Sequence, residues 1–129
     1  MLNYVFFRNL IKYRTLYIET KYFSDYKDFV MDNVLSKEIK PNSNIAIYGF
    51  GPYGESYFLD LFSKYKITAL YDRTYCLNKR IINSPEKINS EKFDYIIVTV
   101  MNEKARNGVL DFLNKKNISE EKIICVNYV

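Results

Sequence analysis

A glycine-rich turn between an apolar run and a helical pattern constrains this chain more than any other feature. Residues 45–47 form a short strand-like run, and a turn that reads G-F-G-P-Y-G begins at Gly49 and ends at Gly54. This is the G-x-G-x-x-G spacing in the strand-to-helix context that dinucleotide binding requires. A helix start of this kind offers unpaired N–H groups and a positive dipole end to an anion. The sequence therefore predicts an anion site whose natural ligand is a nucleotide phosphate.

Each glycine of this turn has its own expected role. Gly49 permits the tight turn after the strand, and Gly51 lets the backbone approach a pyrophosphate without a Cβ in the way. Gly54 lets the new helix lie close to the sheet. Pro52 suits the first helical position, because that position tolerates a missing N–H.

An acidic residue follows at the distance that the dinucleotide fingerprint expects. Residues 66–71 form a second strand-like run that ends at Asp72, roughly 20 residues after the glycines. A carboxylate there can accept hydrogen bonds from both hydroxyls of a ribose, although Asp is also a common turn residue. Arg73 could meet a 2′-phosphate or simply be solvated. The candidate ligand-binding residues are Gly49, Phe50, Gly51, Pro52, Tyr53, Gly54, Asp72 and Arg73.

Strands and helices alternate through the same part of the chain. We expect strands at 44–48, 66–71, 93–100 and 123–126, helices at 52–64 and from 102 to about 116, and a short helix that starts at 84. Asn102 can cap the second of these helices. Apolar residues lie at helical spacing in both long helices, namely Tyr57, Phe58, Leu61 and Phe62 in the first and Ala105, Val109, Phe112 and Leu113 in the second. The near-continuous apolar run at 93–100 is typical of a parallel strand covered on both faces. The sequence therefore predicts an α/β fold with a Rossmann-like, open, mainly parallel sheet and helices on both faces, preceded by an N-terminal helical segment.

Two regions are expected, divided at the turn-type residues 40–44. Residues 1–40 form an N-terminal helical extension, and residues 41–129 form the Rossmann-like nucleotide-binding domain. The extension is richer in apolar side chains than two exposed helices need, so it could cover the sheet, mediate self-association or contact a partner, or lie on a membrane surface. No window is long and uncharged enough to span a bilayer, and no signal peptide is recognised, so we expect a cytoplasmic protein.

The composition excludes several kinds of chemistry. The 129 residues include no histidine, which excludes a Ser-His-Asp triad and a Cys-His dyad and leads us to expect no metal site. The two cysteines, Cys76 and Cys125, form no motif, and we expect both to be reduced and non-catalytic. The net charge of +4 is mild, and A/T-rich codons explain the many tyrosines as well as base stacking does, so we do not expect a nucleic-acid partner.

The order of the motifs resembles a small Rossmann-like module of bacterial surface-polysaccharide biosynthesis. Modules of this kind accompany glycosyltransferases and sugar methyltransferases, or form the nucleotide-sugar-binding part of sugar acetyltransferases. The resemblance implies NAD(P) or a nucleotide sugar as ligand, and a homo-oligomer or a carbohydrate enzyme as partner through residues 1–40. It places Gly49, Gly51, Gly54 and Asp72 in the pocket. It covers residues 44–126 and rests on the segments 45–54, 66–72, 82–86, 93–98 and 122–124.

Four functions remain open on the sequence. A nucleotide- or nucleotide-sugar-binding module without a catalytic group is favoured, because the chain is short and has no second lobe to close over a substrate. An NAD(P)-dependent oxidoreductase is an alternative, but neither of the two Tyr-x-x-x-Lys pairs follows a strand late enough to face a nicotinamide. A methyltransferase that uses S-adenosylmethionine is a weaker one. In the fourth, the protein is structural, and the ring of Phe50 or Tyr53 fills the space above an empty glycine loop.

Overall fold

The computed structural model describes residues 25–73, 82–100 and 102–126. The predictions that concern residues 1–24, the Tyr-x-x-x-Lys pair at 75/79 and Cys76 lie outside these residues. The described residues divide into two compact units, one that ends at Ile39 and one that runs from Lys40 to Val126.

The described part of the first unit is a helix. It covers residues 25–38 and contains a π-helical segment, η1 (Met31–Leu35), before its last turn, α3 (Ser36–Glu38). The apolar side chains buried in this helix or directly after it are Val30, Met31, Leu35 and Ile39. The predicted helical segment before residue 40 is confirmed for these residues.

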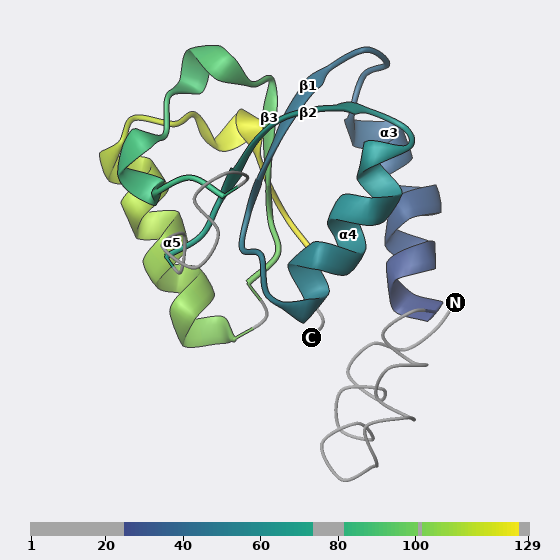
Figure 1. Cartoon of the computed structure of the whole chain (residues 1–129), viewed down its shortest axis with the longest axis horizontal. Coiled ribbons are helices and arrows are strands. Elements are labelled where there is room, and N and C mark those ends of the chain that lie inside the picture. Colours follow the sequence, from purple (N-terminus) through teal and green to yellow (C-terminus); the bar gives the residue numbers. More distant parts are fainter. Residues whose placement is uncertain (1–24, 74–81, 101, 127–129) are drawn as a thin grey trace, which may run out of the picture. The chain divides into compact units, whose positions relative to one another are not determined.

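The second unit is built on a four-stranded sheet in which every pairing is parallel (Figure 1). Its strands are β1 (Asn44–Tyr48), β2 (Lys66–Tyr71), β3 (Tyr95–Val98) and β4 (Ile123–Cys125). They lie in the order β2-β1-β3-β4, so β2 is on one side of β1 and the later strands are on the other. The predicted α/β class with a parallel sheet is confirmed. The direction in which strands are added reverses between β1 and β3.

The helices that follow β1 and β3 lie on opposite sides of the sheet (Figure 1). They are α4 (Pro52–Phe62) and α5 (Glu103–Lys115). Asn102 caps α5 as the sequence suggests, because its side-chain oxygen accepts a hydrogen bond from the Ala105 N–H at 2.9 Å. The short helix expected at residue 84 is a single 3-10 turn, η3 (Pro85–Lys87), with Ser84 as its cap. Further 3-10 turns are η4 (Ser90–Lys92) and η5 (Glu120–Lys122).

Consecutive residues of a strand point to opposite faces of the sheet, and here both sets of side chains are buried. One buried cluster joins alternate residues of three strands to Leu113 of α5; its strand members are Ala46, Tyr48, Ala69, Tyr71, Ile96 and Val98. The intervening side chains are buried as well, and these are Ile45, Ile47, Leu70 and Ile97. Both faces of the sheet are therefore part of the core.

The apolar stripe of α4 differs from the one that the sequence pattern suggests. Tyr57, Phe58, Leu61 and Phe62 all fit one helical face by spacing, yet Phe62 is 66% exposed. Only Tyr57 and Leu61, four residues apart, are completely buried. Phe58 is half-buried, and its ring lies against that of Phe62 with 5.6 Å between centroids. The buried stripe is therefore narrower than predicted.

Candidate functional site

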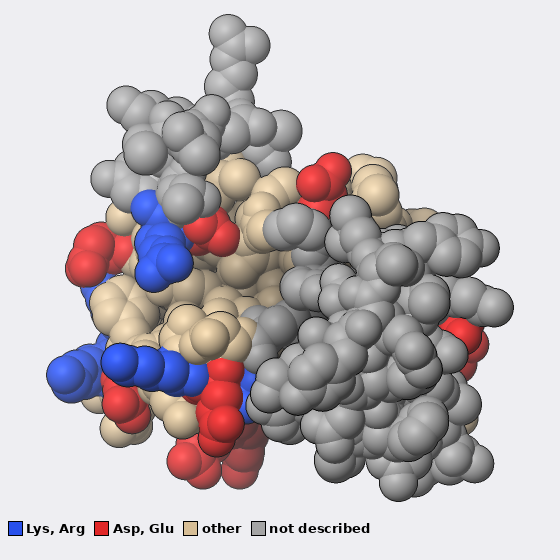
Figure 2. Space-filling view, turned by 90° about the horizontal axis from the view of Figure 1, so that it is seen from below, with Lys and Arg blue, Asp and Glu red and all other residues tan. Residues whose placement is uncertain are grey.

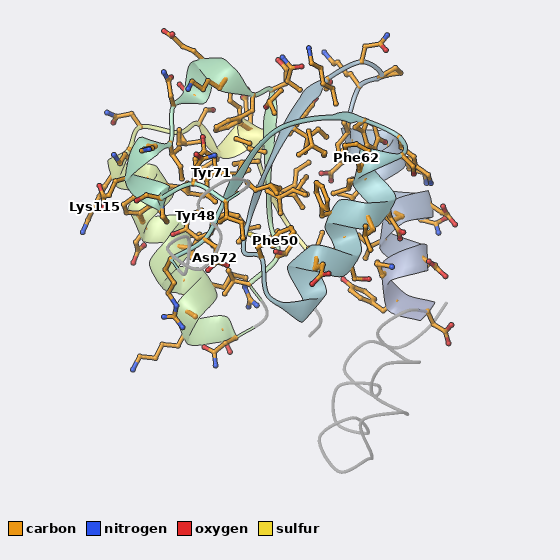
Figure 3. All side chains as sticks on the ribbon, viewed as in Figure 1. Tyr48, Phe50, Phe62, Tyr71, Asp72 and Lys115 are labelled. Atoms are coloured by element: carbon orange, nitrogen blue, oxygen red, sulfur yellow. The ribbon has the colours of Figure 1, made fainter. Side chains whose placement is uncertain are left out.

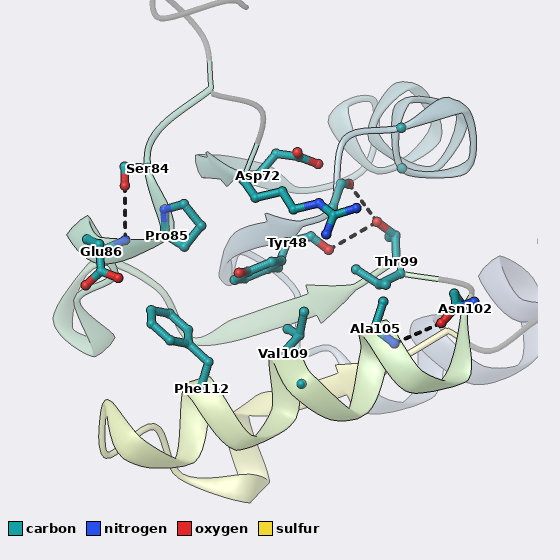
Figure 4. A pocket seen from close by; sticks show the side chains of 16 residues that line it. Tyr48, Asp72, Ser84, Pro85, Glu86, Thr99, Asn102, Ala105, Val109 and Phe112 are labelled. Carbon is teal, nitrogen blue, oxygen red and sulfur yellow. Dashed lines mark hydrogen bonds between the residues drawn. The ribbon is translucent and has the colours of Figure 1, made fainter. Parts of the chain in front are cut away.

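A pocket of about 940 Å³ opens at the carboxyl ends of the strands (Figure 4). Its lining includes residues from the ends of β1, β2 and β3, at the place where the strand order reverses. Open parallel sheets bind their ligands at such a reversal, because the helices on its two sides leave in opposite directions and open a crevice. Most of the predicted binding residues line this pocket, namely Gly49, Gly51, Gly54, Asp72 and Arg73.

The other predicted residues of the glycine loop have different positions. The Phe50 ring is directed toward α4 and contacts the Phe58 ring edge-on, with 5.5 Å between centroids (Figure 3). It therefore packs beside α4 and does not line the pocket. Pro52 is the first residue of α4, as predicted, while the side chains of Pro52 and Tyr53 lie outside the described part of the structure.

The three glycines of the loop have distinct geometries. Gly49 has a φ of +108°, which L side chains rarely adopt, and a Cβ there would lie 2.7 Å from the Thr99 Oγ1. A Cβ on Gly54 would lie 1.9 Å from the Gly49 carbonyl oxygen, so the helix start lies directly against the end of the strand. A Cβ on Gly51 would meet no atom within 4 Å. The tight turn and the close helix packing agree with the sequence analysis, and Gly51 borders open space in the pocket.

The peptide group between Gly49 and Phe50 is held on both sides by side chains that follow the neighbouring strands. The Phe50 N–H donates a hydrogen bond to Asp72 Oδ2 at 2.5 Å. The Gly49 carbonyl accepts one from the Thr99 hydroxyl at 2.7 Å (Figure 4). Asp72 follows β2 and Thr99 follows β3, so the glycine loop is tied to both strands that flank β1.

The Asp72 geometry adds to what the sequence predicts. The carboxylate lies at the pocket wall as expected, but it also bonds to the backbone of the glycine loop. An ionised carboxylate has about four lone-pair sites, so it can accept hydrogen bonds from more than one donor. Whether Asp72 or Arg73 contacts a ligand stays a prediction.

One part of the pocket is apolar, and the sequence analysis did not identify it. Ala105, Val109 and Phe112 of α5 contribute side chains to the pocket, and Pro85 lies across from Phe112 (Figure 4). The Tyr48 ring completes this part and meets the Phe112 ring edge-on, with 6.5 Å between centroids. In the sequence, the apolar residues of α5 form a stripe at helical spacing, which by itself indicates only a buried helix face. The sequence signal that could have identified this part of the pocket is the position of the helix, because a helix that follows a strand at the reversal of strand order borders the ligand crevice.

The turn opposite α5 is tied to the end of that helix. The Lys116 ammonium donates a hydrogen bond to the Glu86 carbonyl at 2.9 Å and lies 3.6 Å from a Glu86 carboxylate oxygen. Because the Glu86 side chain is 77% exposed, this ion pair contributes little stability. The hydrogen bond from the Lys116 ammonium to the Glu86 carbonyl holds the η3 turn beside the pocket.

Charges of both signs surround the pocket. Burial raises the pKa of Tyr48 above its ordinary value of 10.0, the carboxylates of Asp72 and Glu86 raise it further, and Arg73 lowers it. The Tyr48 hydroxyl therefore stays protonated near neutral pH. Figure 2 looks onto the carboxyl ends of the strands, and basic and acidic side chains are interspersed in the part of this face that is described.

Three further properties concern the described part of the chain. Residues 25–73, 82–100 and 102–126 contain no group of three or more Cys, Asp or Glu side chains arranged to hold a metal ion. No helix among them combines the length and apolarity that a bilayer span needs. Burial raises the pKa of Cys125, against a smaller opposite effect of Arg106, so this thiol is protonated near neutral pH.

A family model described as C2185-like, N-terminal matches residues 41–124. The chain belongs to this family. The match includes the glycine loop, the strands β1, β2 and β3, the first two residues of β4, and both α4 and α5. Comparisons with curated proteins and with solved structures give no significant match.

The family match contradicts the resemblance inferred from the motif order. The chain belongs to the C2185-like family, and its assignment to a small Rossmann-like module of surface-polysaccharide biosynthesis is wrong. The physical reason is that a strand, a glycine turn, a helix and an acid at the next strand end are geometric requirements of many open parallel sheets. Their order specifies a loop geometry and leaves the family open.

The Tyr48 hydroxyl reports the charges around the pocket and provides a test of the site geometry. We expect Asp72→Asn and Glu86→Gln each to lower the pKa of Tyr48, and Arg73→Gln to raise it, because each change removes one of the charges that act on the hydroxyl. Tyrosine ring-carbon NMR during an alkaline titration measures this. Asp94→Asn is the control, since Asp94 bonds to the Asn44 N–H at the opposite end of β1. A Tyr48 titration that none of the pocket variants alters would contradict the arrangement.

Alanine at different glycines should have opposite effects on stability. Gly54→Ala should destabilise the domain by about 1–3 kcal/mol or more, since its Cβ overlaps the Gly49 carbonyl. Gly108→Ala, within α5 and with no atom within 4 Å of the added Cβ, should stabilise by roughly 0.5–1 kcal/mol. Urea unfolding measures both changes. Equal effects of the two substitutions would show that α4 does not lie against the end of β1.

Proposed function

We propose that this C2185-like domain binds a ribonucleotide-type ligand in the pocket at the junction of β1 and α4, and that it acts as a binding module in a Rossmann-like arrangement. The observation that carries the proposal is the position of Gly51. It borders open space at the start of α4, in the same pocket as Asp72. A helix start beside an acid that follows the neighbouring strand suits a phosphate joined to a ribose.

The phosphate would lie at the first turn of α4. The first N–H groups of a helix have no acceptor within the helix. Pro52 has no N–H, and the Glu55 N–H bonds to the Gly51 carbonyl at 2.9 Å, so the donors at this helix start are the N–H groups of Gly51, Tyr53 and Gly54. The α4 dipole adds positive potential at the same place.

The remainder of the ligand fits the rest of the pocket. A ribose beside Asp72 would donate its hydroxyl protons to the carboxylate, which only accepts. A nucleobase fits the apolar part between Pro85 and Phe112, because its flat faces are desolvated there by side chains without hydrogen-bonding groups. The volume of about 940 Å³ lies within the usual range for small-molecule pockets, roughly 300–1,000 Å³.

The pocket chemistry favours binding over catalysis. A general base works best with a pKa near the operating pH, whereas the pKa of Tyr48 is raised above 10.0. The Phe50 ring lies beside α4, which speaks against the alternative in which that ring fills the space above the loop. NAD(P) and nucleotide sugars share the ribose and pyrophosphate for which the site is suited, so the proposal includes both ligand classes.

Thermal-shift measurements with NAD, NADP, ADP, S-adenosylmethionine and UDP- and GDP-sugars test the proposal. A ligand at a hundred times its dissociation constant should stabilise the protein by about 2.7 kcal/mol. Gly51→Val should abolish this shift without unfolding the protein, because its side chain enters open space in the pocket. Leu59→Val, at an exposed position of α4, is the control and should keep the shift.

Two outcomes would contradict the proposal. The absence of a shift with every nucleotide would favour the structural alternative. A shift that persists in Gly51→Val would show that the phosphate is held elsewhere.

A further inference from the structure

We propose that Thr99 is a positioning residue for ligand binding, which acts with Asp72 to clamp the Gly49–Phe50 peptide and so fixes the glycine loop that leads into α4. This inference rests on the proposed function. Its basis is the pair of hydrogen bonds that hold the two ends of one peptide group, from the Phe50 N–H to Asp72 and from Thr99 to the Gly49 carbonyl.

The two hydrogen bonds hold opposite edges of the Gly49–Phe50 peptide plane. In a trans peptide the C=O and the following N–H point in opposite directions, and the structure contains no cis peptide bond among the residues it describes. The Gly49 carbonyl therefore faces Thr99 and the start of α4, while the Phe50 N–H faces Asp72, and both Thr99 and Asp72 line the pocket. Rotation of this plane by half a turn would bring the carbonyl oxygen against the Asp72 carboxylate.

The clamp matters because glycine gives this plane rotational freedom. Gly49 has no Cβ and has a φ of +108°, so the backbone at this position has little steric preference of its own. The Gly49 carbonyl oxygen lies against the start of α4 at Gly54, so a rotation of this peptide plane would displace the helix N–H groups that a phosphate would meet. The orientation must therefore come from the partners of the peptide group.

Thr99 is well placed for this role. It is 4% exposed, and its N–H donates to the Tyr48 carbonyl at 2.9 Å, which extends the β1–β3 pairing by one residue. Its hydroxyl has one proton to donate and lies closer to the Gly49 carbonyl, at 2.7 Å, than to the Tyr48 carbonyl, at 3.2 Å. Valine at this position would keep the shape of the side chain and leave the Gly49 carbonyl without this donor.

Hydrogen exchange of the Phe50 amide tests the clamp in the ligand-free protein. Thr99→Val should raise this exchange about ten-fold relative to the core amide of Ile97, the equilibrium factor that corresponds to one lost buried hydrogen bond. Thr99→Ser retains the hydroxyl and should restore slow exchange. Thr68→Val is the matched control, because the Thr68 hydroxyl also bridges to a backbone carbonyl, that of Lys92 at 2.8 Å, and is not part of the pocket. If Thr99→Val does not fold, Thr99→Ala provides the same test.

Calorimetry with ADP and with UDP tests the consequence for binding. Thr99→Val should raise the dissociation constant of the nucleotide that binds by about ten-fold. The dissociation constants of Thr99→Ser and Thr68→Val should stay within about three-fold of the wild-type value. Unchanged Phe50 exchange in Thr99→Val would overturn the clamp, and unchanged affinity would overturn its role in binding. If the wild type binds neither nucleotide, the role in ligand binding is overturned together with the proposed function, and the exchange experiment still decides whether the clamp exists.

Discussion

The start of α4 lies against the end of β1 at the Gly49 carbonyl, where a Cβ on Gly54 would be only 1.9 Å from the oxygen. Any side chain at Gly54 would overlap that oxygen, so the close approach of helix and strand requires glycine at this position. The Thr99 hydroxyl approaches the same oxygen from β3, at 2.7 Å. One carbonyl therefore joins the strand, the helix and the neighbouring strand. The pocket depends on this junction, because it sets where the N–H groups at the start of α4 point.

The rest of the site follows from the sheet topology around that junction. Since β2 and β3 lie on either side of β1, residues that follow each of them reach the glycine loop from both directions. Asp72 supplies a charge, Thr99 supplies a donor, and α5 brings apolar side chains such as Phe112 to the same pocket. The pocket therefore has a polar part beside an apolar part. A nucleotide has the same arrangement, because its phosphate is charged and the faces of its base are apolar.

The sequence predicted the features that local chemistry determines. Strands at 44–48 and 66–71 and the Asn102 cap agree with the structure because periodicity and capping act over a few residues. The apolar run at 93–100 is longer than the strand, because β3 covers only Tyr95–Val98. Thr99 could not be recognised, because a threonine in such a run reads as a strand residue. Its role depends on a contact across about fifty residues of sequence, for which local patterns give no signal. The family was wrongly inferred for a related reason, as a shared loop geometry does not define ancestry.

The central claim is that backbone amides at the junction of β1 and α4 bind a nucleotide phosphate. An amide NMR titration with ADP, and in parallel with UDP, tests it most directly, because each backbone N–H reports its own environment. The largest shifts are expected at Gly51 and Gly54, with smaller ones at Asp72 and along α5. Shifts confined to other parts of the chain, or none with either nucleotide at millimolar concentration, would contradict it.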